Sequence, residues 1–266
     1  MIHPQSELIR EPNLLVHRKQ PVLPVKVNRQ HPKSRNLLGY WLEKRNLVSP
    51  KNNFILNGNC KVTQTSRGIG LDSPGSSPND ASIPDNNYFS FGNGSSDIPF
   101  SISALVYYRD GGGASNGFSI CSKYKTTMPV FDGEYNFNIT SSGNLVLQIL
   151  DNETTNRCRQ DSNSALSKNA WYHLGFTYDA SGVDEGLVLY KDGKVFPSTG
   201  FGQDASYVAM HNRTADFCLF SSITNADPYD SFGDGFMTDI RVYRNRVLTT
   251  EEAEIYRDPY QHLIPA

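Results

Sequence analysis

The chain has 266 residues and 38% hydrophobic content, which is enough for one large β-sandwich with a single core. Residues 1–60 carry ten Lys/Arg against three Asp/Glu, a net charge of +7, while residues 61–266 carry fifteen against twenty-four, a net charge of −9. The acidic body would repel phosphate, so nucleic-acid binding is excluded for it, and no apolar run is long enough to span a membrane.

Residues 1–36 are predicted to form an extended arm. No helical or alternating pattern persists in this stretch. Each of its prolines lacks an amide donor and pushes the preceding residue toward extended geometry. The prolines are Pro4, Pro12, Pro21, Pro24 and Pro32.

The arm also carries apolar residues that need a surface to lie on. Two placements are open, because the arm can fold back on its own domain or lie on a neighbouring subunit. In the second case its positive charge and its apolar area would both serve assembly. The residues expected to make these contacts are Arg18, Lys19, Val22, Leu23, Val25, Lys26, Arg29, Lys33 and Arg35.

From Leu37 onward, short apolar or alternating segments come between turn signals, which is typical of a sandwich or barrel. In residues 100–108, the alternate side chains from Phe100 to Val106 share one face. Residues 72–87 are expected to form a loop. Strands in this half are expected at 37–42, within 52–61, and at 100–108, 118–123, 135–139 and 145–150.

The second half has the clearest signals. Residues 171–178 are predicted to form a strand that places Trp171 and His173 on one side. Asp192-Gly193 lies between two apolar segments and predicts a β-hairpin, because both residues can take positive φ. Further strands are expected at 187–190, 194–196, 217–220 and 236–243, and a helix at 251–256 that Thr249 or Thr250 caps and Pro259 ends.

Four sequence motifs resemble those of laminin-G-like, concanavalin-A-like domains and occur in the same order as in that family. One departure is visible, because Ser221-Ser222 stand where the family has a glycine, which affects a local turn and not the fold. The resemblance covers about residues 60–258 and implies an all-β antiparallel jelly-roll of two sheets. We assign the sandwich to residues 37–258 and a C-terminal tail to residues 259–266. The motifs are Phe100-Ser101-Ile102-Ser103-Ala104, Trp171 to Asp179, Leu187 to Lys194, and Gly235 to Glu254.

The arm carries a second resemblance. Residues 18–28, His31-Pro32 and residues 37–42 are similar to the leader that precedes such domains in tailed-bacteriophage and prophage proteins. This implies a virion structural protein, such as a capsid decoration, fibre or tail component, assembled in the host cytoplasm and joined to other virion proteins through its arm. The absence of a signal-peptide pattern fits that route, and a homo-oligomer is expected on general grounds.

We expect no enzymatic activity. A retaining glycosidase needs two carboxylates about 5 Å apart on one strand face, and Asp234 and Asp239 would point to opposite faces of their strand. No nucleophile elbow, Walker A loop or dinucleotide fingerprint is present. His173 lies on a predicted core strand, where a packed histidine is expected, and Trp41 and Trp171 are interpreted as core aromatics. The four cysteines are spaced too widely for a metal or redox motif, so free thiols are expected.

A polar loop before the last strand is the candidate ligand site. It contains Asp227, Tyr229, Asp230 and Asp234. One interpretation is an ordinary solvated acidic loop. A second is a Ca²⁺ site, because Ca²⁺ takes six to eight oxygen ligands. A third is a contact with surface glycans, since an aromatic ring beside carboxylates suits a sugar.

These observations support two main hypotheses and disfavour a third. The first is a non-enzymatic virion protein, anchored by its arm, whose outward-facing sandwich can also bind glycans. The alternative is a free carbohydrate-binding lectin in which the arm is incidental. The third, a glycoside hydrolase, lacks the pair of carboxylates that its chemistry requires.

Overall fold

The computed structural model describes residues 25–49, 51–76, 78–109, 117–127, 130–151, 156–202, 205–224, 231–250 and 263–265. Several predicted features therefore lie outside the described residues. They are Arg18, Lys19, Val22 and Leu23 of the arm, Asp227, Tyr229 and Asp230 of the loop, and the helix at 251–256.

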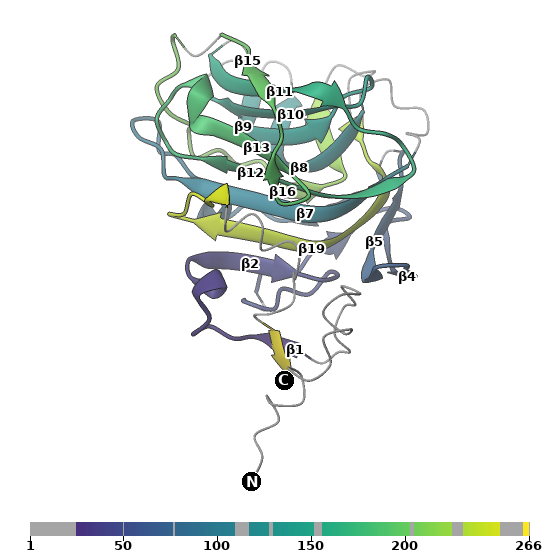
Figure 1. Cartoon of the computed structure of the whole chain (residues 1–266). Helices are drawn as coiled ribbons and strands as arrows, with labels where there is room; N and C mark the ends of the chain where they lie inside the picture. Colours follow the sequence, from purple (N-terminus) through teal and green to yellow (C-terminus); the bar gives the residue numbers. More distant parts are fainter. Residues whose placement is uncertain are drawn as a thin grey trace.

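The chain folds into two antiparallel sheets packed face to face, which confirms the predicted all-β jelly-roll (Figure 1). One sheet has eight strands in the order β14-β13-β12-β7-β19-β5-β4, with β2 also paired to β19. Its strands are β2 (Leu37–Trp41), β4 (Lys61–Thr65), β5 (Gly68–Pro74), β7 (Phe100–Tyr108), β12 (Ala170–Tyr178), β13 (Leu187–Lys191), β14 (Lys194–Val195) and β19 (Asp234–Arg244).

The second sheet has ten strands in the order β15-β11-β10-β9-β8-β16-β6-β3, with β17 and β18 beside β8. All its pairings are antiparallel except β17 with β8. Its strands are β3 (Ile55–Leu56), β6 (Ala81–Ile83), β8 (Phe118–Thr127), β9 (Val130–Ile139), β10 (Asn144–Leu150), β11 (Arg157–Ala165), β15 (Ser198–Gly200), β16 (Phe217–Leu219), β17 (Ser221–Thr224) and β18 (Ser231–Phe232).

Most predicted strands are confirmed, and two differences have a clear cause. The hairpin turn is present, with φ of 51° at Asp192 and 81° at Gly193. The loop predicted at 72–87 was wrong, because β5 extends to Pro74 and β6 occupies Ala81–Ile83. β11 was missed because its sequence is almost entirely polar and lacks the alternation of a half-buried strand.

The core between the sheets is rich in aromatic rings. Phe137 of one sheet lies 5.0 Å, ring centre to ring centre, from Phe176 of the other, and Phe100 lies 5.4 Å from Tyr135. Trp41 is also part of this core and is fully buried, as expected. Burial of each large apolar side chain contributes about 1.5–3 kcal/mol, so these contacts hold the two sheets together.

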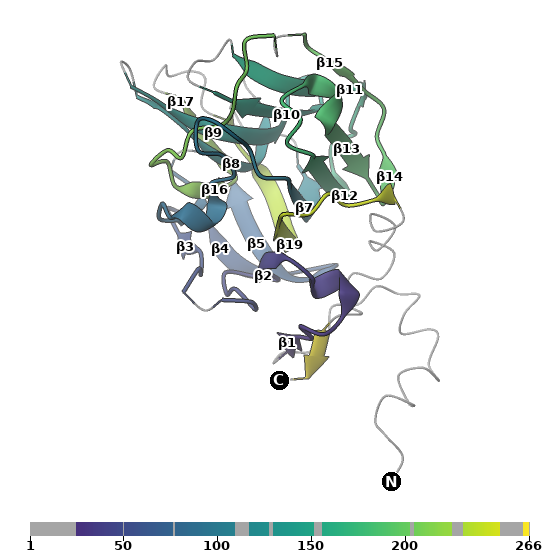
Figure 2. The same cartoon turned by 90° about the vertical axis from the view of Figure 1, so that its left-hand side faces the viewer.

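The terminal segments cover part of the other face of the eight-stranded sheet, called here the outer face. β1 (Val25–Val27) pairs with β20 (Leu263–Pro265), and both strands lie beyond β2 in the two views (Figures 1 and 2). Val25 and Val27 pack in a second apolar cluster with Tyr40 of β2 and Tyr243 of β19. The described part of the arm therefore folds back on its own domain.

A charged group is buried on the outer face. Asp239 has a φ of 52° at a β-bulge of β19. Arg241 Nη2 donates to Asp239 Oδ1 at 2.7 Å, and its guanidinium carbon lies 5.0 Å from the centre of the Tyr40 ring. His173 Nε2 lies 3.7 Å from Asp239 Oδ2. Burial works to raise the pKa of Asp239, but the charge of Arg241 and the contacts with His173 and Tyr40 together outweigh it and lower the pKa.

The bulge corrects one prediction. Asp234 and Asp239 were expected on opposite strand faces, but the extra residue at the bulge shifts the alternation. Both carboxylates consequently make their ion pairs on the outer face, Asp234 with Arg109 and Asp239 with Arg241.

All four cysteines are buried and free, as expected. Among the residues that the structure describes, there is no helix with the length and apolar character needed to cross a bilayer.

Replacing Arg241 by Met should destabilise the fold strongly. The carboxylate of Asp239 would stay buried without its cation, which costs about 3–5 kcal/mol. Urea unfolding at pH 7 measures this loss. The double variant Arg241→Met/Asp239→Asn should recover much of it, because no unpaired charge remains; equal losses in both variants would contradict the assignment.

The stability should also fall in acid because of His173. Burial lowers the pKa of His173 below its ordinary 6.5, with Arg241 adding to the effect. Below about pH 6.5 the His173 imidazole binds a proton in the unfolded chain but stays neutral in the folded chain. The free energy of unfolding therefore decreases as the pH falls. Urea unfolding at pH 7.5 and 5.5 should show a smaller difference for His173→Gln than for the wild type, and an equal difference in both proteins would contradict the assignment.

Candidate functional site

Three aromatic side chains form a row across the uncovered end of the outer face. Trp171 of β12, Tyr107 of β7 and Phe236 of β19 are cross-strand neighbours. The Tyr107 ring centre lies 5.4 Å from Trp171 and 5.6 Å from Phe236, and the planes of Trp171 and Phe236 differ by 19°. All three are half-buried. This aromatic row therefore presents apolar ring surface at a fixed place on a rigid sheet.

Charged groups border the aromatic row on one side. The guanidinium carbon of Arg109 lies 4.5 Å from the centre of the Phe236 ring. Arg109 forms ion pairs with Asp72 and with Asp234, whose Oδ1 lies 2.8 Å from Nε, and donates from Nη2 to the Ser73 carbonyl at 3.0 Å. Because the long arginine side chain is held at four points, its position is set before any ligand arrives.

The row and its charged border suit a ligand with one flat apolar side and many hydroxyl groups. Ring surfaces contribute apolar contact at little cost in side-chain entropy, and carboxylates accept hydrogen bonds from hydroxyl groups. At the end of the row away from Arg109, Trp171 Nε1 donates to Ser66 Oγ at 3.2 Å, which fixes the indole. A sugar ring has one flat apolar side and several hydroxyl groups, so it matches the row and its border.

The predicted ligand loop is represented in the structure by Asp234 alone. This carboxylate is already paired with Arg109, so it does not fit a Ca²⁺ site as it stands. Within the described residues, no group of three or more His, Cys, Asp or Glu side chains is arranged to hold a metal ion. Asp234 instead forms part of the border of the aromatic row, beside Phe236.

The predicted assembly residues of the arm divide by polarity. Val25 is half-buried in the second apolar cluster of its own domain. Lys26, Arg29 and Arg35 are exposed, and Arg29 donates to the Val48 carbonyl at 2.6 Å. Lys33 lies in η1 (Pro32–Ser34). The basic residues with described side chains thus face solvent, while the apolar ones face the domain.

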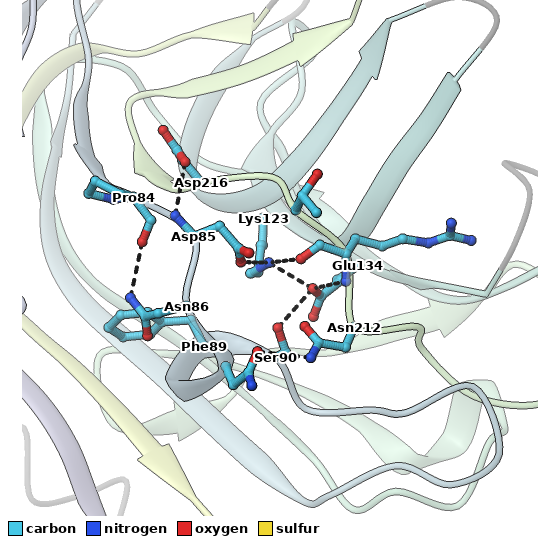
Figure 3. Close-up of polar contacts among 12 residues, drawn as sticks. Pro84, Asp85, Asn86, Phe89, Ser90, Lys123, Glu134, Asn212 and Asp216 are labelled. Atoms are coloured by element: carbon cyan, nitrogen blue, oxygen red, sulfur yellow. Dashed lines mark hydrogen bonds and ion pairs between the residues drawn. The ribbon is translucent and has the colours of Figure 1, made fainter.

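A second group of charged residues lies inside the sandwich margin (Figure 3). Lys123 of β8 is fully buried, and its Nζ lies 2.7 Å from Asp85 Oδ1 and 2.8 Å from Glu134 Oε1, and donates to the Arg213 carbonyl at 2.6 Å. Glu134 Oε1 also accepts from Ser90 Oγ and from the Arg213 amide. We call Lys123, Glu134 and Asp85 the lysine cluster.

Burying the lysine cluster costs desolvation free energy. Burial raises the pKa of Glu134 to about 6, although Lys123 and the hydrogen bonds to the carboxylate oppose that shift. Glu134 Oε2 is fully buried and has no hydrogen-bond partner among the described residues. A buried ion pair is often no more stable than apolar residues of the same size, so packing alone does not account for this group.

Sequence reasoning did not single out Trp171, Tyr107 and Phe236 as candidate site residues. Trp171 was interpreted as a core aromatic, and this was wrong because the indole lies on the outer face. The signal was available: Tyr172, Leu174 and the following alternate residues are the apolar set, so Trp171 had to face the other way. The convergence of β12, β7 and β19 could not be predicted from local pattern.

The match to a family model covers most of the chain. Residues 79–254 match the family described as the concanavalin A-like lectin/glucanases superfamily. No curated protein is similar enough in sequence to be recognised as a relative.

Solved structures with the same fold come from clostridial and trypanosomal proteins. The binding domain of Paraclostridial Mosquitocidal Protein 1 aligns with a TM-score of 0.63 and 13% identity, over 86% of this chain and 53% of that one. The binding domain of botulinum neurotoxin serotype D/C aligns with 0.57 and 14%, over 85% and 52%. Trypanosoma rangeli sialidase aligns with 0.54 and 14%, over 95% and 38%.

The chain thus spans about half the length of the first two structures, and at these identities the likeness concerns the fold. The family model matches two thirds of the chain, across both sheets. The chain therefore belongs to the concanavalin A-like lectin/glucanase superfamily.

Proposed function

We propose that this protein is a non-enzymatic glycan-binding module that is anchored in a virion by its N-terminal arm. The observation that carries the glycan part is the aromatic row with Arg109 beside it. Half-exposed rings on three adjacent strands, bordered by fixed charged groups, are a surface on which the apolar side of a sugar can lie.

The arrangement of acidic groups supports a binding role rather than a catalytic one. Asp72 and Asp234 both form ion pairs with Arg109, so both carboxylates are already engaged with a cation. Glu134, which has the raised pKa of a general acid, is fully buried beside the equally buried Lys123. A buried acid of this kind cannot reach a glycosidic oxygen without opening the loops above it.

The arm supports the virion part of the proposal. The apolar side chains of residues 25–27 are used by the arm's own domain, so attraction between charges is the main means left for the exposed Lys26, Arg29 and Arg35 to hold a neighbour. Attachment of a basic arm to an acidic partner weakens with salt, because the Debye length is only about 8 Å at physiological ionic strength. The free lectin is the alternative, and it has the same sandwich without a need for the arm.

Replacing Trp171 by Ala should weaken glycan binding by at least about tenfold, which corresponds to about 1.4 kcal/mol. An array of immobilised oligosaccharides, with wild-type protein in the presence and absence of calcium, identifies bound structures, and isothermal titration then gives the affinities. Phe201→Ala is the matched control, because Phe201 is an aromatic residue with 49% exposure that directly follows β15 of the other sheet. If the wild-type protein binds none of the oligosaccharides on the array, the glycan proposal is wrong. If Trp171→Ala and Phe201→Ala weaken binding equally, the glycan site is not the aromatic row.

Removing residues 1–24 should abolish assembly and leave the sandwich intact. The truncated chain keeps β1 and the second apolar cluster, so its near-ultraviolet circular dichroism should match that of the full chain. Light scattering after size exclusion should give an oligomer for the full chain at low salt, a smaller mass at high salt, and a monomer for the truncated chain. Lys194→Glu, an exposed charge reversal on the sandwich, should have no effect. Identical masses for the two chains would contradict the assembly role.

A further inference from the structure

We infer that the surface formed by residues 84–90 and 211–216 is a second binding site, for a neutral ligand rich in hydroxyl groups such as an oligosaccharide, and that Lys123 positions it. The inference rests on the proposed function in its choice of ligand class, but the residues and the place are different.

The surface carries one exposed aromatic ring among side-chain amides. Tyr88, in η2 (Asn87–Phe89), has 59% of its surface exposed. Asn87 and Asn212 are also exposed, and Asn212 Nδ2 donates to Asn87 Oδ1 at 2.9 Å. After that bond, the side-chain NH₂ group of Asn87 can still donate to a ligand, and the side-chain oxygen of Asn212 can still accept from one. A ring with a donor and an acceptor beside it is suited to the ring and hydroxyl groups of one sugar.

Both loops of this surface are held rigidly from below. Lys123 Nζ contacts Asp85 in one loop and the Arg213 carbonyl in the other, and Glu134 likewise accepts from Ser90 in one and from the Arg213 amide in the other (Figure 3). The lysine cluster therefore ties the two loops to the same two strands. A polar surface fixed in advance loses less entropy when it binds a ligand.

Further contacts fix the loop edges. Asp132 accepts from both the amide and the hydroxyl of Thr214 at 2.8 Å. Asp216 Oδ1 accepts from the Asp85 amide at 3.0 Å. Arg244 Nη1 donates to the Ser90 carbonyl at 3.0 Å. These hydrogen bonds place the loops without using the Tyr88 ring, the side-chain NH₂ group of Asn87 or the side-chain oxygen of Asn212.

The charges around the surface favour a neutral ligand over an anion. Asp85, Asp132 and Asp216 lie at its border against two arginines, Arg213 and Arg244, and Lys123 is buried and fully engaged. The carboxylates outnumber the two arginines, so the surface repels a phosphate, sulfate or carboxylate more than a neutral ligand. Hydroxyl groups can instead donate to them, as the Thr214 hydroxyl already does to Asp132.

The second surface and the aromatic row lie at opposite ends of the same strand. Phe236 is near the start of β19, and Arg244, whose guanidinium contacts the carbonyls of Asn87 and Tyr88, is its last residue. Their partners on β7, Tyr107 and Phe100, are seven residues of strand apart, or roughly 23 Å. Two weak sites at this spacing on one rigid module raise the overall affinity for a polymer without any new contact.

The test uses ¹H–¹⁵N NMR spectra of the full chain, titrated with maltohexaose, cellohexaose and chitohexaose as separate probes. At least one probe should shift the amide signals of Tyr88, Asn212 and Arg213. Tyr88→Ala should weaken that response at least tenfold and leave shifts at Trp171 unchanged. Lys123→Met should weaken it too, again with the Trp171 response intact. Phe201→Ala should change nothing.

Each outcome decides between the two sites. Shifts at Trp171 without shifts at Tyr88 would overturn this inference and leave the proposed function standing. Shifts at Tyr88 alone would support the inference and refute the aromatic row as the glycan site. A Tyr88→Ala variant with undiminished response at Asn212 would overturn the inference. So would a spectrum unchanged by all three probes, which would also count against the proposed function.

Discussion

The eight-stranded sheet has one face packed in the core and one face outside it, and the rest of the structure depends on how the outer face is covered. Its inner face packs against the ten-stranded sheet through rings such as Phe100 and Phe176. Its outer face has to be covered or made polar, because an exposed apolar sheet face invites association. The terminal segments cover one end, and the aromatic row occupies the other, where it remains half-exposed.

The bulge at Asp239 connects these two halves. It shifts the alternation of β19, so that Arg241 lies under Tyr40 in the covered part while Phe236 and Asp234 remain in the uncovered part. The covered end contains a buried charged group that contacts Tyr40 of β2, and Tyr40 shares the second apolar cluster with Val25 and Val27. The base of the arm and the eight-stranded sheet are therefore in contact through this cluster.

Buried charge has different consequences in two places. Asp239, Arg241 and His173 lie on the outer face of the eight-stranded sheet, where the Arg241 guanidinium contacts the Tyr40 ring of β2. The lysine cluster lies beneath two surface loops and connects them to β8 and β9. Both groups cost desolvation energy that apolar residues would avoid. The lysine cluster holds Tyr88, Asn87 and Asn212 in fixed positions in return for this desolvation energy. A recognition surface needs fixed positions of this kind.

The sequence by itself determined the strands that have a strong alternating pattern, such as 100–108, the Asp192-Gly193 hairpin and the sandwich architecture, because these depend on local periodicity and turn chemistry. It did not determine β11, whose polar residues carry no periodic signal, or the bulge at Asp239. The two proposed binding surfaces depend on tertiary structure. Trp171, Tyr107 and Phe236 lie as far as 129 residues apart in the chain, and Lys123 meets Asp85 across 38 residues and Arg213 across 90. Such groups form only when strand pairing brings distant segments side by side, and no local pattern of residues encodes that order.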